Sequence, residues 1–212
     1  MIGYAICGSF CSFSASLAVL ERLVLSGEEI QPIMSERAYY TDTRFWLASE
    51  YVSRVSSICG REIIHTVSDA EPLGPKKPLD ALIISPCTGN TLAKLANGIT
   101  DTAVTMAAKA HLRQDRPLLI ALASNDAMSQ NLMNVSRLLT RRSVYFLPMR
   151  QDDPEKKPYS SLVQPRPPSA TDLVNKSSSG AITSVMKYPH IIVNDTISSA
   201  NQRAAAESFN RF

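Results

Sequence analysis

The sequence predicts an α/β protein with a doubly wound, mainly parallel sheet of the Rossmann-like or flavodoxin-like kind and helices on both faces. Short apolar runs alternate with segments of helical periodicity, and loops rich in Ser, Thr, Asn and Gly follow several of the apolar runs. Hydrophobic residues make up 44% of the 212-residue chain, enough for one sizeable core. Strands that alternate with helices form parallel sheets, because each helix carries the chain back to the starting edge.

The first part of the chain contains two predicted helices. Apolar residues at helical spacing from Phe13 to Val24 indicate the first, and Gly27 follows at a C-cap position. The second begins near residues 41–43 and stops at Gly60. Short apolar runs beside these helices predict strands at residues 4–7, 30–34 and 61–67.

A proline-rich segment separates the two halves of the pattern. Residues 71–78 contain three prolines, which neither a helix interior nor a central strand accommodates. The second half repeats the alternation, with predicted strands at residues 81–84, 118–123 and 144–147, and helices after the loop at residue 87 and at residues 103–110 and 132–139.

Composition and charge argue against several classes of protein. The net charge is only +3 and the basic residues are dispersed without aromatic interleaving, so we expect no nucleic-acid partner. No apolar run of about 18 residues and no signal-like leader occurs, which predicts a cytoplasmic protein without a membrane partner. The four cysteines form no Cys-x-x-Cys pair and the three histidines are scattered, so no metal site is expected. Cys87 is interpreted as a small residue rather than a nucleophile, because no His or carboxylate lies near it in sequence.

Three polar loops are expected to meet at one edge of the sheet. They span residues 8–14, 87–91 and 124–131, and the carboxyl ends of parallel strands form the ligand crevice of such folds. The first loop lacks the G-x-G-x-x-G pattern of dinucleotide folds, which argues against NAD. The hydroxyls of Ser9, Ser12 and Ser35 suit a single phosphate at a helix start, as in a mononucleotide such as FMN. The alternative is that these serines only cap helices.

Several separated segments resemble the FMN-binding cysteine decarboxylase type of flavoprotein. They are Gly8-Ser9, the stretch Ser85-Pro-Cys-Thr-Gly-Asn-Thr-Leu-Ala-Lys-Leu-Ala-Asn-Gly-Ile-Thr-Asp101, and Ala123-Ser-Asn-Asp-Ala-Met128. The resemblance covers residues 1–164, which we interpret as one flavoprotein-type domain. Residues 165–212 are interpreted as a divergent extension that packs on the same domain or on a neighbouring subunit, with a predicted strand at 190–193 and a helix at 199–209.

The resemblance implies FMN as the cofactor and contacts to it from all three loops. Gly8, Ser9 and Ser35 match positions that face the phosphate. The remaining matched or adjacent positions, which serve the phosphate, ribityl chain or ring, are Thr88, Gly89, Asn90, Thr91, Ser124, Asn125 and Met128.

The chain also departs from the decarboxylase pattern. The decarboxylases carry a catalytic His shortly before the strand that leads to the second loop, and this chain has Glu71-Pro-Leu-Gly-Pro75 there. It has Leu122-Ala-Ser-Asn125 where Pro-Ala-Met-Asn is usual, and Ser129 where a Trp is usual. Without the His, decarboxylation of a cysteinyl substrate lacks its expected general acid or base. The sequence does not identify a catalytic residue in its place.

Four further phrases resemble a subgroup of this family that forms pyridine-2,6-dicarboxylate in the mother cell of spore-forming bacteria. They are Asp42-Thr-Arg-Phe45, residues 71–80, Met106-Ala-Ala-Lys-Ala110 and residues 151–158. The subgroup implies flavin-type oxidation of a tetrahydrodipicolinate-type intermediate of the lysine pathway, because ring oxidation needs a hydride acceptor that no side chain supplies. A dicarboxylate substrate calls for cations, and the basic residues in or beside these phrases are Arg44, Lys76, Lys77, Lys109, Arg150, Lys156 and Lys157. Of these, we expect Arg44, Lys76 and Lys156 to contact the substrate, whereas the alternative for each is an exposed surface charge.

The subgroup also implies partners. We expect a separate pyridine-nucleotide-binding A subunit of the same synthase and a homo-oligomer, a trimer or larger, with Met106, Ala107 and Ala110 suited to close helix contact. The alternative function is a non-catalytic partner that binds the intermediate or stabilises that other chain.

Overall fold

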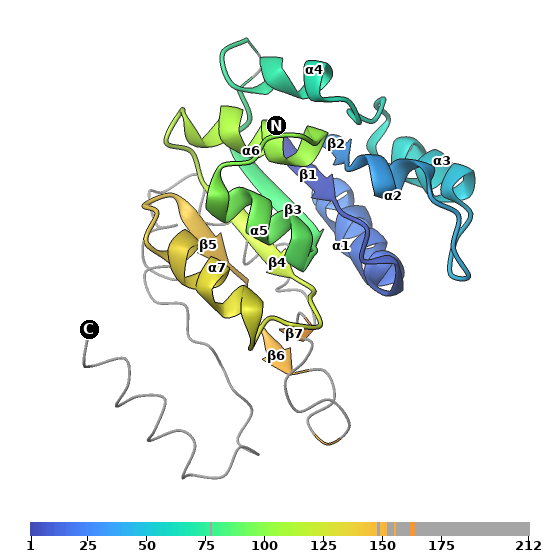
Figure 1. Cartoon of the computed structure of the whole chain (residues 1–212). Coiled ribbons are helices and arrows are strands. Elements are labelled where there is room, and N and C mark those ends of the chain that lie inside the picture. The colour runs from blue at the N-terminus through green and yellow to red at the C-terminus, as the bar shows by residue number, and fades with distance from the viewer. Residues whose placement is uncertain (77, 148, 152–154, 156–161, 164–212) are drawn as a thin grey trace, which may run out of the picture.

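The predicted fold class is confirmed. The computed structural model describes residues 1–76, 78–147, 149–151, 155 and 162–163. A five-stranded parallel sheet has the order β2-β1-β3-β4-β5 (Figure 1). Its strands are β1 (Ile2–Ile6), β2 (Ile30–Met34), β3 (Ala81–Cys87), β4 (Leu118–Leu122) and β5 (Val144–Phe146). A small antiparallel pair, β6 (Arg150–Gln151) and β7 (Leu162–Val163), lies apart from this sheet.

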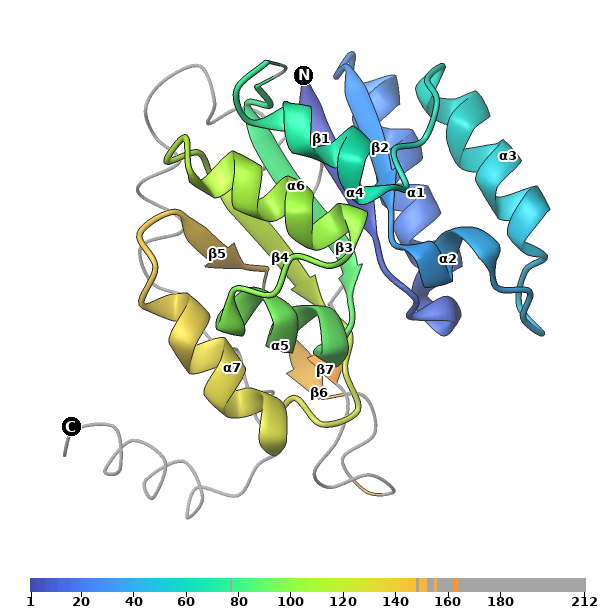
Figure 2. The same ribbon diagram turned by 45° about the horizontal axis from the view of Figure 1, so that its top comes forward.

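Helices cover both faces of the sheet. Helices α5, α6 and α7 lie across one face with α4, whereas α1 lies across the other, beside α3 (Figure 2). The helices are α1 (Phe13–Leu25), α2 (Glu36–Tyr40), α3 (Ala48–Cys59), α4 (Val67–Ala70), α5 (Gly89–Asn97), α6 (Ala103–Leu112) and α7 (Gln130–Leu139), with 3-10 turns η1 (Phe10–Ser12) and η2 (Glu71–Leu73).

Each face of the sheet has its own hydrophobic core. Successive side chains of a strand point to opposite faces, so the interior strand β1 and the residue after it divide their side chains between the two cores. Tyr4 and Ile6 pack on the α1 side, and Ala5 and Cys7 pack on the α5–α7 side. All four are buried, which is why the strand is continuously apolar rather than alternating.

Glycines end the helices where the sequence predicts. Gly27 follows α1 with φ of +90°, and Gly60 caps α3 with φ of +60°. Both lie in the left-handed region that glycine adopts without steric cost.

Two predictions in the first half of the chain are wrong, one of a strand and one of a helix start. Residues 61–67 do not form a strand: Ile64 makes a single parallel bridge to Ile33, and Thr66 then caps α4 by accepting a hydrogen bond from Asp69 N at 3.2 Å. The second long helix starts at Ala48 rather than at residues 41–43. Its first turn is capped by a residue six positions earlier in the sequence, because Asp42 Oδ1 accepts a hydrogen bond from Ala48 N at 2.8 Å.

The proposed self-association face of α6 is internal. Ala107 and Ala110 are buried within the chain, where α6 packs against α4 and η2. An ideal Cβ on Gly74 would lie 2.7 Å from Ala110 O, so η2 approaches α6 too closely for any second helix to enter. The small residues of α6 therefore serve intramolecular packing, and they give no support for a homo-oligomer.

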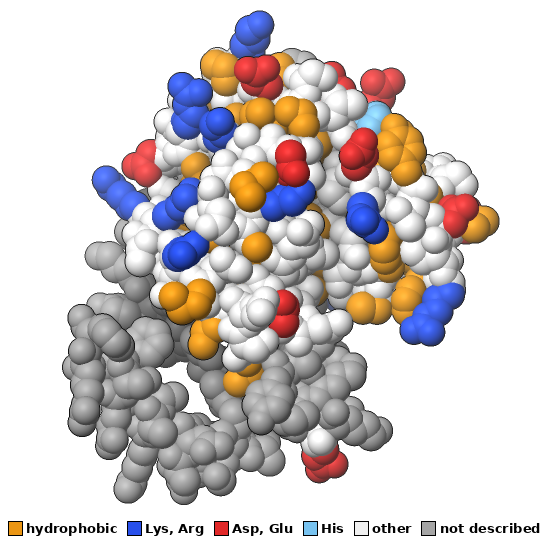
Figure 3. All heavy atoms as spheres, viewed as in Figure 1, with side chains coloured by type: hydrophobic (Ala, Val, Ile, Leu, Met, Phe, Trp, Pro, Cys, Tyr) orange, Lys and Arg blue, Asp and Glu red, His pale blue; other side chains and the backbone are white. Residues whose placement is uncertain are grey.

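Charged side chains of both signs are distributed over the face that carries α5, α6 and α7. Figure 3 shows basic side chains gathered toward the ends of α6 and α7, on the left of the view. Within the described residues no helix is both long and apolar enough to cross a bilayer. The same residues contain no group of three or more His, Cys, Asp or Glu side chains placed to hold a metal ion.

Candidate functional site

The candidate site lies where the strand order reverses, between the carboxyl ends of β1 and β3. The chain leaves β1 toward one face and β3 toward the other, and doubly wound sheets of this order hold their ligands at this point. Cys7 N donates to Pro86 O at 3.1 Å, and Ser16 Oγ donates to Ser85 O at 2.6 Å. The β1 loop and the first turns of α1 are thus fixed to the end of β3.

Two serines after β1 are not engaged as helix caps. Ser9 precedes η1 and Ser12 precedes α1, and neither side chain accepts a hydrogen bond from its helix. Their hydroxyls lie 3.3 Å apart and are half-buried. The capping alternative is wrong for both residues: the two hydroxyls bond to each other, and each can still form a further hydrogen bond to a polar ligand.

Ser35 behaves differently. It caps α2 by accepting from Ala38 N at 3.3 Å and is 7% exposed. A hydroxyl that accepts one bond still has its own proton to donate, so capping and ligand contact are compatible at this residue.

Arg37 is a candidate site residue that the sequence analysis missed. An ideal Cβ built on Gly8 would lie 3.6 Å from Arg37 Cβ, which puts the start of α2 against the β1 loop. Arg37 is exposed and forms no ion pair with any described carboxylate. Its position two residues after the Ser35 cap is the signal that sequence reasoning overlooked.

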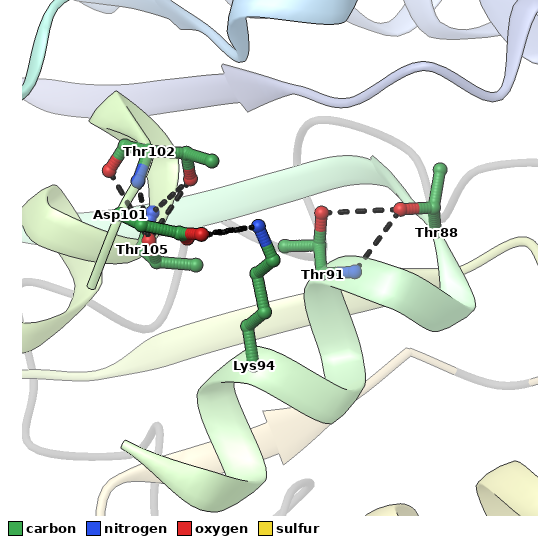
Figure 4. A network of polar contacts seen from close by, with 6 residues as sticks. All are labelled: Thr88, Thr91, Lys94, Asp101, Thr102 and Thr105. Atoms are coloured by element: carbon green, nitrogen blue, oxygen red, sulfur yellow. Dashed lines mark hydrogen bonds and ion pairs between the residues drawn. The ribbon is translucent and has the colours of Figure 1, made fainter. Parts of the chain in front are cut away.

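The β3 loop is held together by its own threonines. Thr88 caps α5, accepting from Thr91 N at 3.2 Å and donating to Thr91 Oγ1 at 3.1 Å (Figure 4). Thr91 is buried, whereas the neighbouring Asn90 is exposed. The threonines therefore shape the helix start, and Asn90 is the side chain of this loop that is accessible to a ligand.

Two cysteines lie beneath these loops. Cys7 and Cys87 are both buried, and burial raises the pKa of the Cys7 thiol to about 11 and that of Cys87 well above its usual value. Thiols in this state are poor nucleophiles, because the thiolate is the reactive form. The interpretation of Cys87 as a small structural residue agrees with this environment.

Asp126 organises the β4 loop and was also missed. Its carboxylate accepts hydrogen bonds from Ser124 Oγ and from Asn131 Nδ2, the latter at 2.6 Å. The bond from Ser124 has the largest effect on the pKa of Asp126 and lowers it; burial opposes this shift, and the bond from Asn131 lowers the pKa by a smaller amount. Asn125 and Met128 are exposed on the loop that this network fixes.

Gly89 brings the β3 and β4 loops into direct contact. An ideal Cβ at this position would overlap Asn131 Nδ2 and Ser124 Oγ and lie 3.0 Å from Asp126 Oδ1. Ala123 N also donates to Cys87 O at 2.8 Å. Gly89 therefore serves the approach of one loop to the other, which is a different role from the ligand contact expected of it.

Arg44 lies at the same edge as the three loops. The first turn of α1 holds its loop, because Trp46 Nε1 donates to Ser14 Oγ at 3.3 Å. Arg44 is exposed, with Cζ 4.8 Å from the centre of the Phe45 ring.

Lys76 is not brought to this edge. It precedes the amino end of β3, and the seven residues of that strand separate it from the loops by about 20 Å. Lys156 and the predicted elements at 190–193 and 199–209 lie outside the described residues.

Neither histidine of the described chain joins the three loops. His65 stacks on Tyr39 with ring centroids 3.9 Å apart. His111 is buried near the amino end of β4, where its Nε2 lies 2.9 Å from Pro117 O and burial lowers the pKa of the imidazole.

A wide open groove of about 750 Å³ lies between α2 and α3. It is lined in part by Tyr39 and Ser53 and contains no residue of the three loops.

The comparisons with known proteins agree with this fold. The profile of the flavoprotein family matches residues 1–187. The dipicolinate synthase B subunit of Bacillus subtilis (strain 168) is 42% identical over 163 residues, which are 77% of this chain and 82% of the relative. The crystal structure of the dipicolinate synthase B subunit from Bacillus halodurans is 34% identical with a TM-score of 0.75, over 92% of this chain and 95% of that one.

A more distant solved structure shares the fold. The FMN-dependent cysteine decarboxylase SpaF is 23% identical with a TM-score of 0.60, over 84% of this chain and 97% of that one. The reversal of strand order, the polar loops around it and these matches lead to one assignment: the chain belongs to the flavoprotein family, as a homologue of the dipicolinate synthase B subunit.

Proposed function

We propose that this protein is the flavin-binding subunit of a dipicolinate synthase and that FMN binds at the β1/β3 switch point. The observation that carries the proposal is the pair of serine hydroxyls at the β1 loop that cap no helix, in a homologue of the B subunit. The synthase would oxidise a tetrahydrodipicolinate-type intermediate of the lysine pathway to pyridine-2,6-dicarboxylate during sporulation, in the mother-cell cytoplasm.

The residues of the site fit the phosphate of FMN. Ser9 and Ser12 bond to each other rather than to a helix end, and their hydroxyls lie beside the starts of η1 and α1, where backbone N–H groups favour an anion. Arg37 adds a cation next to Gly8 without a competing carboxylate among the described residues. Asn90, Asn125 and Met128 are exposed side chains of the other two loops and suit the ribityl chain and ring.

The bound flavin would supply the two-electron acceptor that side chains lack. A hydroxylated tetrahydro ring reaches the dihydro level by losing water, and the dihydro ring becomes aromatic when it loses a hydride and a proton. Two electrons therefore leave the substrate, and a nicotinamide on the partner chain or dioxygen must finally receive them. The chain's own contribution is to bind the substrate carboxylates, for which Arg44 provides the accessible cation at the edge of the loops.

The A subunit of dipicolinate synthase is the proposed partner. This chain lacks a dinucleotide fingerprint after β1, so a pyridine nucleotide would have to bind elsewhere. A homo-oligomer, a trimer or larger, remains part of the proposal. The second candidate function is a non-catalytic protein that stabilises the A subunit, which the absence of a His in the three loops favours.

The two candidates are separated by measuring dipicolinate formation. The A subunit is mixed with a dihydrodipicolinate-pathway intermediate and with this protein, which is either loaded with FMN or free of flavin. A third mixture contains no copy of this protein, and in each the product is followed by its ultraviolet absorbance. We expect faster formation with the loaded protein than with the flavin-free protein. Equal rates for the loaded and flavin-free protein would leave the stabilising role.

Arg37→Ala is expected to weaken FMN binding by about tenfold, because a charge-assisted hydrogen bond to the phosphate contributes roughly 1.5 kcal/mol. Titration followed by quenching of flavin fluorescence measures the dissociation constant. Riboflavin lacks the phosphate and serves as the matched ligand, so its affinity for the variant should equal that for the unaltered protein. Equal losses for both flavins would contradict a phosphate contact.

A further inference from the structure

A second candidate binding site lies on the opposite end of α5 from the switch point. A cavity of about 270 Å³ opens between the ends of α5, α6 and α7. Its apolar walls are Leu95, Ile99 and Leu112, and its polar residues include Thr100 and three basic residues. Helix α5 is nine residues long, so about 13 Å of helix separates this cavity from Thr88 at the flavin loops.

The basic residues of the cavity are Lys109, Arg113 and Arg141, and its lining contains no acidic residue. Within the described part of the chain none of the three forms an ion pair. Figure 3 shows basic side chains gathered in this region of the surface. Three cations thus share a small hollow without a carboxylate from the described residues.

Two acidic residues that are close in sequence to the cavity lining are already engaged. Asp101 holds Lys94 with both carboxylate oxygens at 2.8 Å (Figure 4), and this hydrogen bond lowers the pKa of Asp101. Asp115 accepts a hydrogen bond from Ser143 Oγ at 2.5 Å and lies 3.9 Å from Arg142, outside the cavity. Neither carboxylate neutralises the basic residues of the hollow.

Helix ends account for only part of this charge. Gly98 and Arg113 are the C-caps of α5 and α6, and Arg141 directly follows the C-cap of α7. Each helix C-terminus carries about −0.5 charge, so three of them offset about half of the three positive charges. A surplus of about one and a half positive charges remains, which matches a ligand with two negative charges better than a neutral one.

We propose that this cavity binds a small dianion that carries two carboxylates or one phosphate. Two arginines can each offer a fork of parallel N–H donors to such groups, and Lys109 adds a point charge. The volume is below the range of most cofactor sites, so a nucleotide is too large and a compact acid fits. The apolar walls give a ring or methylene chain a surface to contact. This site is independent of the flavin site.

The test is isothermal titration calorimetry of the full chain with two probes, inorganic phosphate and pyridine-2,6-dicarboxylate, at fixed ionic strength. The variant Arg113→Gln/Arg141→Gln is expected to weaken binding of the preferred probe by at least about tenfold, the loss for one charge-assisted contact. Arg142→Gln is the matched control, because Arg142 is adjacent in sequence, 90% exposed and not part of the cavity. Both arginines of the double variant are exposed, so we expect it to fold, and its thermal melting is measured beside that of the unaltered protein.

Four outcomes would overturn the proposal. The unaltered protein binds neither probe. The double variant and Arg142→Gln lose equal affinity, which indicates general charge attraction. Binding is abolished by Arg37→Ala but not by the double variant, which assigns the anion to the switch-point loops. An acidic polypeptide such as polyglutamate binds with the expected variant dependence while neither small probe does, which indicates a macromolecular partner. Preference for one probe over the other identifies the source of the dianion.

Discussion

Replacing Gly89 by alanine is expected to destabilise the protein and to weaken FMN binding at the same time. The added Cβ overlaps Ser124 Oγ and Asn131 Nδ2, two groups that Asp126 holds in place by hydrogen bonds. Neither can withdraw without breaking that network. Overpacking of this kind costs about 1 to 3 kcal/mol, more than the gain of at most about 1 kcal/mol from alanine's helix propensity at the first residue of α5. Thermal melting and flavin titration measure the two effects.

Gly8→Ala is the matched control for Gly89→Ala. An ideal Cβ on Gly8 would meet the Phe10 ring at 3.5 Å and Arg37 Cβ at 3.6 Å, which are ordinary contact distances. Its stability should stay within about 0.5 kcal/mol of that of the unaltered protein. If the two alanine variants melt at the same temperature, the β3 and β4 loops do not depend on the close approach at Gly89.

The sequence was sufficient for the order and type of most elements. The buried runs that became β1, β3 and β4 are bounded by polar loops, and α1 has apolar residues at helical spacing with Gly27 after it. These signals are local, and tertiary packing reinforces them. The positions of the three loops followed from the same reasoning, because parallel strands bring their carboxyl ends to one edge.

The remaining features depend on contacts between distant residues. Residues 61–67 contain a strand-like apolar run, yet only Ile64 reaches the edge strand β2 before Thr66 begins α4. The small residues of α6 suggest a subunit interface from the sequence alone, whereas in the structure η2 packs against this helix within the same chain. Arg37 is a candidate because it lies next to Gly8, and Asp126 because it accepts hydrogen bonds from Ser124 and Asn131. No periodicity in the sequence predicts these contacts.

The three expected substrate cations illustrate the same limit. Arg44, Lys76 and Lys156 were chosen because they lie in phrases that resemble one subgroup of the family. Sequence proximity to such a phrase does not specify which edge of the sheet a residue occupies. The chain order fixes Lys76 at the amino end of β3, whereas the loop of Arg44 is attached to the first turn of α1.

Arg44→Ala is expected to raise the KM for the ring substrate by about ten- to a hundredfold, because a bidentate contact to a carboxylate contributes roughly 1.5 to 3 kcal/mol. The loop that carries Arg44 is ordered without it. Thr43 Oγ1 accepts from Phe45 N at 3.1 Å and from Trp46 N at 3.2 Å, so removing the guanidinium leaves the backbone in place. FMN affinity should not change. The measurement is dipicolinate formation with the A subunit over a range of substrate concentrations.

Arg54→Ala is the matched control for Arg44→Ala. Arg54 is also an exposed arginine, but its Nη2 is paired with Glu21 Oε1 at 2.7 Å on the outer side of α1 and α3. A surface pair of this kind contributes at most about 1 kcal/mol to stability and nothing to a substrate that binds at the loops. An unchanged KM in Arg44→Ala would remove Arg44 from the substrate site. An equal rise of KM in both variants would indicate long-range attraction of the dianionic substrate by positive charge. A direct contact, in contrast, is lost only when the arginine that touches the substrate is replaced.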